Sequence, residues 1–346
     1  MLKYEQLSFF NGEEKAQPKE SVSQNSNFSE VQISYKVRNS FSITELPFLG
    51  CDFDSVYPAL ANIIPKEYIV FSDFPLNVAI SCEIICAAIC HQMNWDYLRN
   101  TIFMKVTENN AWVSADNLTS ISEAEVFEMF AMYSKPERIR KKERTTILHE
   151  IGKWMKNYQS VEDVFLRNNE LLDNNSIRYN LLTCSAFSND PEEKKMSLLL
   201  QKLSAYVPLM GLSEYYQPAI DYHLIRCYLR RGLLYAKTKY AVDYLQNSNV
   251  ERKESTVAAV RELCSKLLSD ICNYTNLNIS IVNQIEWNIG RSVCTHDSPD
   301  CFLELDDSKW LRPKFEVCPF FNTCAARHHN KIYLQLNEPK YTGSSY

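Results

Sequence analysis

Apolar residues recur every three to four positions along most of the chain, which predicts helices. The clearest such stripe runs through residues 76–88, after the helix-start run Ser72-Asp73-Phe74-Pro75. Nearly every position in this stripe is apolar or small, so we expect a central helix that is buried on all sides. It ends in the polar run Cys90-His91-Gln92-Met93-Asn94-Trp95, and a further helix should start at Asp96.

Similar patterns predict helices farther along the chain. Ser122 and Glu125 form a capping box before an apolar run, and an amphipathic helix should follow it to about residue 155. We expect two short helices within residues 160–182, around the Asn-rich run 167–176, then a helix that starts at the run Asn189-Asp190-Pro191. Residues 218–231 and 233–280 are also helical by pattern. The sequence thus predicts a mainly all-α protein.

Four segments differ in pattern. We expect a partly ordered, irregular N-terminal extension over residues 1–65 with a short helix near its end, from about residue 58, and a helical domain over 66–182. A hairpin and acidic-helix region should follow over 183–290, and a cysteine-rich loop and tail over 291–346. Only 7 glycines occur in 346 residues, which disfavours the glycine-dependent Rossmann and P-loop folds.

The net charge and the cysteine content limit the type of nucleic-acid binding and the cellular compartment that we expect. The formal net charge of −5 argues against a protein that coats nucleic acid non-specifically, although one local basic face is compatible with it. No run reaches the length of a membrane span, and no signal-peptide core is present. Because twelve cysteines occur without an export signal, we expect a reducing cytoplasm and some thiols that hold a metal. We also expect a monomer.

One stretch places a carboxylate at the start of a helix. In Pro218-Ala219-Ile220-Asp221-Tyr222-His223-Leu224-Ile225-Arg226, Asp221 precedes the helix and Arg226 follows just over a turn later. Asp at this position commonly caps the helix. The alternative is catalytic, because a carboxylate can stabilise positive charge that develops on a substrate.

Four later cysteines have the spacing C-x6-C-x16-C-x5-C: Cys294, Cys301, Cys318 and Cys324. Four thiolates can hold a [4Fe–4S] cluster or a structural zinc ion. Zinc sites typically use ligand pairs two to four residues apart, which neither outer pair has, so the spacing favours iron–sulfur.

Together these features resemble helix-hairpin-helix DNA glycosylases of the endonuclease III type, over roughly residues 70–330. Asp221, His223 and Arg226 match the family's apolar-apolar-Asp-x-His-apolar-x-Arg motif, and the outer cysteine spacings match its cluster motif. The middle cysteine spacing is longer than in that family, and the usual Gly-x-Gly hairpin is absent. The Asp-Pro-x-x-Lys-Lys run is closer to archaeal 8-oxoguanine DNA glycosylases.

The resemblance implies a two-lobed glycosylase fold and assigns candidate roles. Asp221 would stabilise the breaking glycosidic bond, and Gln92, or else Asn94, would fill the gap left by a flipped base, unless both only end a helix. Lys195, with Lys202 and Lys194 as alternatives, would form a Schiff base if the enzyme also has AP-lyase activity. Asn189 would lie at the hairpin and Arg226 on a phosphate-facing or solvated helix face.

The implied function is excision of a modified base from double-stranded DNA, with an oxidised or otherwise modified purine as the first expectation and a modified pyrimidine as the alternative. The implied cofactor is a [4Fe–4S] cluster. A different class of function also fits the residues: a non-catalytic iron–sulfur or zinc protein that binds nucleic acid on the same scaffold.

Overall fold

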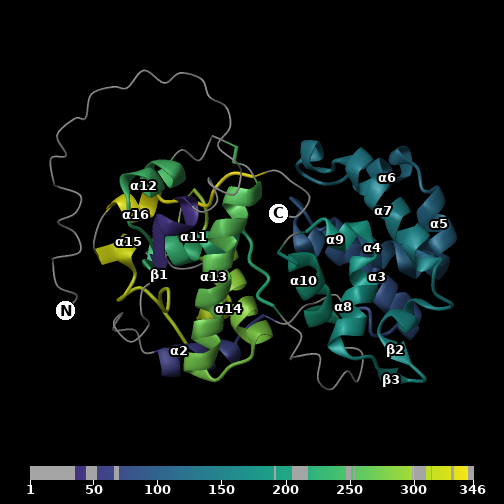
Figure 1. Cartoon of the computed structure of the whole chain (residues 1–346), viewed down its shortest axis with the longest axis horizontal. Coiled ribbons are helices and arrows are strands. Elements are labelled where there is room, and N and C mark those ends of the chain that lie inside the picture. Colours follow the sequence, from purple (N-terminus) through teal and green to yellow (C-terminus); the bar gives the residue numbers. More distant parts are fainter. Residues whose placement is uncertain are drawn as a thin grey trace.

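The computed structural model describes residues 36–43, 53–65, 70–190, 192–204, 217–246, 251–252, 254–297, 299, 309–312, 314–328 and 331–341. The structure is 64% helix and 4% strand, which confirms the all-α prediction. Figure 1 shows two groups of helices side by side, and each encloses its own hydrophobic core. Among the described residues, no helix combines the length and the apolar character that crossing a membrane requires.

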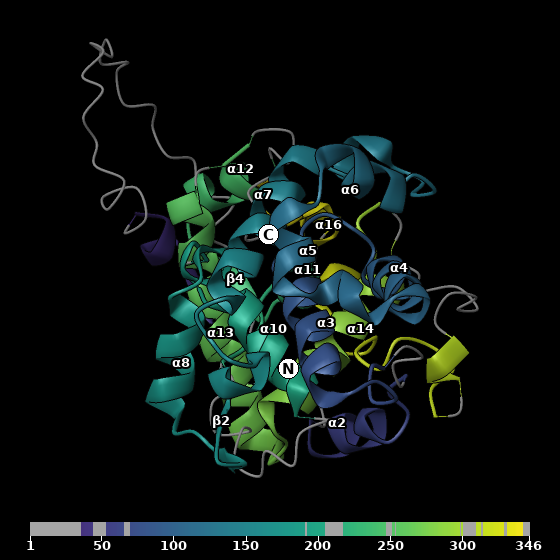
Figure 2. The ribbon, with the colours of Figure 1, turned by 90° about the vertical axis from the view of Figure 1, so that its right-hand side faces the viewer.

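The first lobe is built from the middle of the chain. Its elements are α3 (Leu76–Ile89), α4 (Trp95–Glu108), η4 (Asn110–Val113), α5 (Ala115–Ser120), α6 (Glu123–Met129), η5 (Pro136–Arg138), α7 (Lys141–Met155), η6 (Val161–Val164), β2 (Leu166–Arg167), β3 (Glu170–Leu171), α8 (Asn174–Leu182), α9 (Ser185–Ser188) and α10 (Lys194–Leu203). Figure 2 views the molecule from the side of this lobe.

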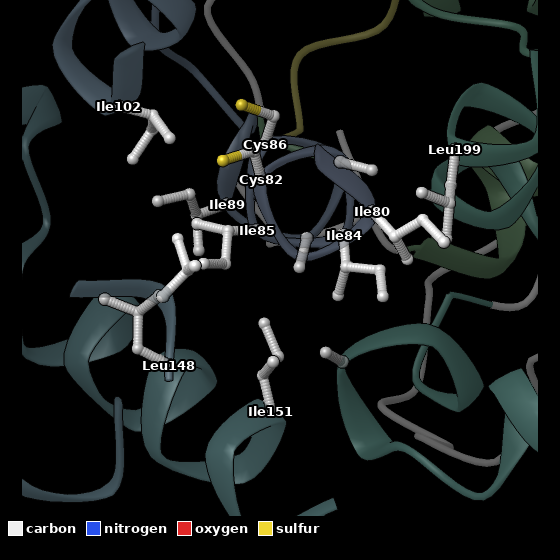
Figure 3. Close-up of a cluster of buried hydrophobic side chains, with 14 of the residues drawn as sticks. Ile80, Cys82, Ile84, Ile85, Cys86, Ile89, Ile102, Leu148, Ile151 and Leu199 are labelled. Atoms are coloured by element: carbon white, nitrogen blue, oxygen red, sulfur yellow. The ribbon is translucent and has the colours of Figure 1, made fainter. Parts of the chain in front are cut away.

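Helix α3 forms the centre of the first lobe, as its uniform apolar pattern predicts. All of its residues from Val78 to Ile89 are buried. Figure 3 shows Ile85 pointing toward Leu148 of α7, while Ile80 points toward Leu199 of α10. Burial on every side removes a large apolar area from water and makes α3 the main stabilising element of this lobe.

The second lobe combines an early segment with the C-terminal part of the chain. Its elements are β1 (Phe41–Ile43), α2 (Phe53–Ala61), α11 (Tyr222–Arg231), β4 (Leu234–Ala236), α12 (Lys239–Gln246), α13 (Glu254–Thr275), α14 (Ile279–Ser292), η8 (Lys309–Leu311), α15 (Ala325–His328) and α16 (Lys331–Gln335). Strands β1 and β4 pair antiparallel, with Ser42 opposite Tyr235.

A buried polar network joins α2, α11 and α14 at the centre of the second lobe. The guanidinium Nη1 of Arg231 lies 2.8 Å from both carboxylate oxygens of Glu286, and its Nη2 donates to the hydroxyl of Tyr57 at 3.2 Å. The Tyr57 hydroxyl also donates to Glu286. Because each charged group is paired and hydrogen-bonded, the network can lie inside the core without an isolated buried charge.

The packing divides the chain differently from the expected boundaries. Helix α10 contributes Leu199 and Leu203 to the first core, although residues 183–290 were expected to form one region. Helix α2 belongs to the second core, so part of the expected extension 1–65 is an integral element of that lobe. Residues far apart in sequence share these cores, which a reading of local pattern does not reveal.

Two local predictions also differ from the structure. Residues 234–236, which were expected to be helical, form strand β4 because they pair with the distant strand β1. The turn of the short β2–β3 hairpin, with Asn168 and Asn169 at positive φ, lies in the Asn-rich run between the two short helices that were expected. Helix α10 begins at Lys194, four residues after Asp190, because Glu193 adopts a left-handed conformation with φ 50° immediately before it. The predicted capping box of Ser122 and Glu125 is confirmed.

Candidate functional site

A pocket of about 410 Å³ lies between the two lobes. The first lobe lines it with residues 90–96, Tyr133, Lys135, Arg138, Lys194, Leu198, Gln201 and Lys202, and the second with Pro65, Ala219, Asp221, Tyr222, His223, Asn283, Gln284, Trp287, Asn288 and Arg291. The pocket therefore brings together Gln92, Asn94 and Asp221, which the sequence proposed separately. It combines aromatic walls with convergent polar groups, as ligand sites commonly do.

The turn at the end of α3 holds Gln92 in a left-handed conformation, with φ 55°. For a residue other than glycine this conformation costs about 1–2 kcal/mol. The buried guanidinium of Arg144 stabilises the turn, because it donates hydrogen bonds to the carbonyl oxygens of Ile89 at 3.3 Å and His91 at 2.6 Å. A strained residue that is held by buried hydrogen bonds beside a pocket is a functional candidate.

Asn94 lines the pocket, but its side chain has a structural task. Its Oδ1 accepts from the backbone N–H of Tyr97 at 3.0 Å and caps α4. Its own backbone N–H donates to the hydroxyl of Tyr133. Of the two wedge candidates, the structure therefore leaves Gln92 better suited to contact a substrate.

Asp221 is both the cap of α11 and a wall of the pocket. Its Oδ1 accepts from the backbone N–H groups of His223 at 2.9 Å and Leu224 at 3.2 Å, and the residue is 8% exposed. The two interpretations of this residue are thus compatible, since one oxygen makes the cap bonds. The positive end of the helix dipole favours a carboxylate at this position.

The backbone segment that precedes Asp221 is fixed by hydrogen bonds from a side chain of α14. Asn283 accepts from the backbone N–H of Ala219 at 2.6 Å and donates to the carbonyl of the same residue at 3.4 Å. Farther along α14, the ring of His223 lies 3.1 Å from the carbonyl oxygen of Gly290. A Cβ on Gly290 would lie 2.7 Å from the His223 carbonyl oxygen, so only glycine permits this close approach.

The lysines that line the pocket are the two alternatives, Lys202 and Lys194, and not Lys195, which was the first candidate for a Schiff base. Lys195 is 3% exposed, its Nζ lies 3.5 Å from the carbonyl oxygen of Ala186, and burial lowers its pKa. It does not line the pocket, whereas Lys202 and Lys194 do. The ammonium of Lys202 lies 5.7 Å from the ring centroid of Trp95, another residue of the pocket. Lys202, rather than Lys195, shares the pocket with Asp221.

The turn between α9 and α10 is stabilised internally. The buried carboxylate of Asp190 accepts from the backbone N–H of Lys195 at 2.8 Å, so this first-turn donor is not available to a phosphate. Asn189 ends α9, is exposed and lies outside the pocket. Its predicted place at a turn is confirmed, while its contact with DNA stays a prediction.

Arg226 does not form the external face that was expected. It is 2% exposed, and its guanidinium donates to the carbonyl oxygens of Cys294 at 2.7 Å and Gly290 at 2.9 Å and to the carboxylate of Glu338 at 2.6 Å. The expected contact of Arg226 with DNA phosphate is therefore corrected. Its donors are used to hold the C-terminal loop against α11.

Arg230 extends the same attachment. It is buried, donates to the carbonyl of His296 at 2.7 Å and to the side chain of Asn337 at 2.8 Å, and lies 3.7 Å from the sulfur of Cys294. The arginines of α11 therefore anchor the cysteine loop from inside. A phosphate-facing or solvated position was expected for Arg226, because local pattern does not show what a later segment covers.

Three of the four predicted cysteine ligands lie near one another beside α11. The thiol of Cys324 donates to the carbonyl of Arg230 at 3.5 Å. Burial raises the pKa of both Cys318 and Cys324, and neighbouring thiols add to the effect in each case. Cys301 lies outside the described residues. Over the described part of the chain, no group of three or more His, Cys, Asp or Glu has the arrangement of a complete metal site.

Cys294 differs from the other two thiols. A hydrogen bond from Cys227 and the guanidinium groups of Arg230 and Arg226 lower its pKa against the opposing effect of burial. A thiolate is the form that binds a metal. Cys294, Cys318 and Cys324 thus act electrostatically on one another beside the buried arginines of α11.

Basic side chains predominate among the charged residues that line the pocket. Lys135, Arg138, Lys194, Lys202 and Arg291 line it, against the acids Asp96 and Asp221. Arg291 of α14 pairs with Asp96 of α4, which joins the lobes at the pocket. Residues 138–144 contain five basic residues, and these have different environments: Arg138 lines the pocket, while Arg144 is wholly buried.

Sequence reasoning missed two polar residues of the pocket. His91 is 2% exposed, and neither ring nitrogen has a hydrogen-bond partner among the described residues. Burial, with the nearby guanidinium of Arg144, holds its pKa well below the usual range. The buried Nε2 of Gln201 also has no partner within the described chain. In the sequence, only their positions next to the candidates Gln92 and Lys202 could have indicated that His91 and Gln201 line the pocket.

Comparison with known proteins adds no relative: no protein-family model matches the chain, and no curated protein matches it.

Proposed function

We propose that the protein is a DNA glycosylase that hydrolyses the N-glycosidic bond of a modified base in double-stranded DNA. The observation that carries this proposal is the composition of the interlobe pocket, where Asp221, Gln92 and Lys202 line one space. Bases must leave the duplex to be excised, so the enzyme needs a pocket, a group that replaces the flipped base, and a group that stabilises the sugar.

Asp221 supplies the electrostatic contribution. As the base leaves, the sugar acquires oxocarbenium character, and a nearby carboxylate stabilises this positive charge. The cap bonds to His223 and Leu224 fix the carboxylate, and the bonds from Asn283 to Ala219 fix the backbone that leads to it. A preorganised carboxylate needs little rearrangement at the moment of reaction.

Gln92 is the group that fills the gap in the duplex. Its strained turn is held by Arg144 at the end of a rigid, buried helix, which suits a side chain that must enter a base stack. Lys135, Arg138 and Lys194 provide positive charge at the same pocket. Phosphate contacts of this type position a protein on DNA independently of sequence, even when its net charge is negative.

Lys202 is the candidate amine for AP-lyase activity. An amine that attacks C1′ would displace the base, whose glycosidic bond breaks as the new C–N bond forms. Opening of the sugar ring at the C1′–O4′ bond then gives a Schiff base, from which the 3′ phosphate can leave by elimination with cleavage of the strand. Lys202 lines the pocket with Asp221, whereas the amine of Lys195 faces Ala186. In an enzyme that only releases the base, Lys202 would contact phosphate instead.

The cofactor that we propose is a [4Fe–4S] cluster held by Cys294, Cys301, Cys318 and Cys324. Its role is structural: it would tie the C-terminal loop to α11, where Arg226 and Arg230 already hold the loop backbone. Purified protein should be brown and contain iron, and Cys318→Ser should remove the colour. Colourless wild-type protein that contains zinc would reject this cofactor.

The test of the main proposal is single-turnover base release from duplexes that each carry one modified base. Asp221→Asn should lower the release rate by about 100-fold or more while DNA binding persists. Asp96→Asn is the matched control, because Asp96 lines the same pocket but is exposed and paired with Arg291. Equal rates for Asp221→Asn and wild type would refute the role of Asp221. DNA binding without release of any base would favour the non-catalytic alternative.

A further inference from the structure

Two polar side chains of the pocket, the buried His91 and the half-buried Gln201, have buried nitrogen atoms whose hydrogen-bonding capacity the described chain does not use. His91 leaves both ring nitrogens without a partner, and Gln201 leaves its amide Nε2 without one. The nearest carboxylate to His91, that of Glu143, lies 3.6 Å from Nε2, beyond hydrogen-bond distance. Buried groups of this kind carry a desolvation cost unless a ligand pairs with them.

The two residues come from different elements of the first lobe. His91 follows α3, and Gln201 lies seven residues into α10, about 10 Å along the axis from Lys194. Trp95 and Trp287 also line the pocket and provide flat apolar surfaces. A planar ring with polar atoms on its edges has the chemistry to meet both the aromatic walls and the two side chains.

We propose that His91 and Gln201 are specificity-determining residues that read the hydrogen-bonding edges of an uncharged base. This inference rests on the proposed glycosylase function. The amide Nε2 of Gln201 can only donate, so it requires an acceptor such as a carbonyl oxygen. A neutral imidazole offers one donor and one acceptor, which match the adjacent C=O and N–H groups of a lactam edge.

The charges around His91 restrict the substrate further. Arg140, Arg144, Lys194 and Lys195 all act electrostatically on its ring. A base that carries a formal positive charge, such as a 7-alkylated purine nucleotide, would meet repulsion there. The pocket should therefore select neutral lactam bases, whether oxidised purines or uracil-type pyrimidines, over cationic alkylated bases.

The experiment compares single-turnover release of 8-oxoguanine, uracil and 7-methylguanine from matched duplexes. Wild type should release at least one lactam base faster than 7-methylguanine. His91→Phe and Gln201→Met should each slow release of that lactam base about tenfold more than they slow release of 7-methylguanine. Asn180→Leu is the matched control, because the Asn180 amide lies outside the pocket and already donates to the Val164 carbonyl at 3.0 Å. It should change all rates by a similar factor.

A second readout separates this inference from the proposed function. Free 8-oxoguanine and uracil should quench the fluorescence of Trp95 and Trp287, and quenching should weaken in His91→Phe and Gln201→Met but not in the control. Absence of base release by wild type would overturn the glycosylase proposal alone. Unchanged selectivity and unchanged quenching in both variants, with folding verified by circular dichroism, would overturn the roles of His91 and Gln201. A wild type that prefers 7-methylguanine would also overturn them.

Discussion

The side-chain amide of Asn283 forms hydrogen bonds with both the backbone N–H and the backbone carbonyl of Ala219, which lies 64 positions earlier in the sequence. Two residues later the chain reaches Asp221, which caps α11 and lines the pocket. An amide on α14 therefore sets the position of a carboxylate at the start of α11. The stability of the second lobe and the geometry of the candidate site depend on the same contact.

Asn283→Ala should consequently affect both properties. It leaves the buried N–H and C=O of Ala219 without their partner, which should lower the free energy of unfolding by about 1–3 kcal/mol. Urea denaturation measures this change, and base release should fall with it if the glycosylase proposal holds. Asn62→Ala removes only a local, exposed bond to Pro58 and should cost less than about 0.5 kcal/mol. Equal losses for the two variants would contradict the positioning role.

Gln92→Gly should separate stability from function. Glycine adopts the left-handed conformation without the steric cost of a side chain, but it also loses more backbone entropy on folding. The two effects are similar in size, so the unfolding free energy should change by about 1 kcal/mol or less, while base release should fall because the wedge is missing. Asn168→Gly, at φ 53° in the β2–β3 turn, should preserve both stability and activity. Full activity of Gln92→Gly would exclude the wedge role.

Borohydride trapping should distinguish the lysines. If the enzyme has AP-lyase activity, wild type and Lys195→Met should give a covalent adduct with a base-excised oligonucleotide, and Lys202→Met should give none. The physical reason is access: Lys202 lines the pocket, while the amine of Lys195 faces Ala186 in the core. An adduct that still forms with Lys202→Met but not with folded Lys195→Met would show that Lys195, and not Lys202, forms the Schiff base.

His91 should make stability depend on mildly acidic pH. Its folded-state pKa lies below the unfolded value near 6.5, so the folded protein binds fewer protons, and the unfolding free energy falls as the pH drops through 6.5. The loss should approach about 1.4 kcal/mol for each pH unit between the two pKa values. His223, whose pKa is also lowered by burial, contributes in the same direction.

Chemical denaturation at pH 7.5, 6.5 and 5.5 tests this dependence. His91→Phe should flatten the pH profile, because it removes one of these two histidines whose folded-state pKa is lowered. Gln92→Ala, which changes the adjacent residue without removing a titratable group, should keep the wild-type slope. An unchanged slope in His91→Phe would show that His91 does not remain neutral in the folded protein.

Local pattern was sufficient for features that depend on neighbouring residues. The uniform apolar run of α3 predicted a helix buried on all sides, since no face of it could favour water. The cap at Ser122 and the cap role of Asp221 followed from side chains that bond to backbone N–H groups two or three residues later. The polar turn at Gln92 was visible for the same reason.

Only the tertiary structure decided which polar side chains face the pocket. Arg226 resembles a solvated helix residue until the C-terminal loop covers it and uses its donors. Lys195 and Lys202 lie on one helix, yet packing against α9 buries the first while the second lines the pocket. His91 and Gln201 are polar residues without a distinctive spacing. Their exposure depends on contacts between distant segments, because burial is a property of the packed lobes rather than of a local run of residues.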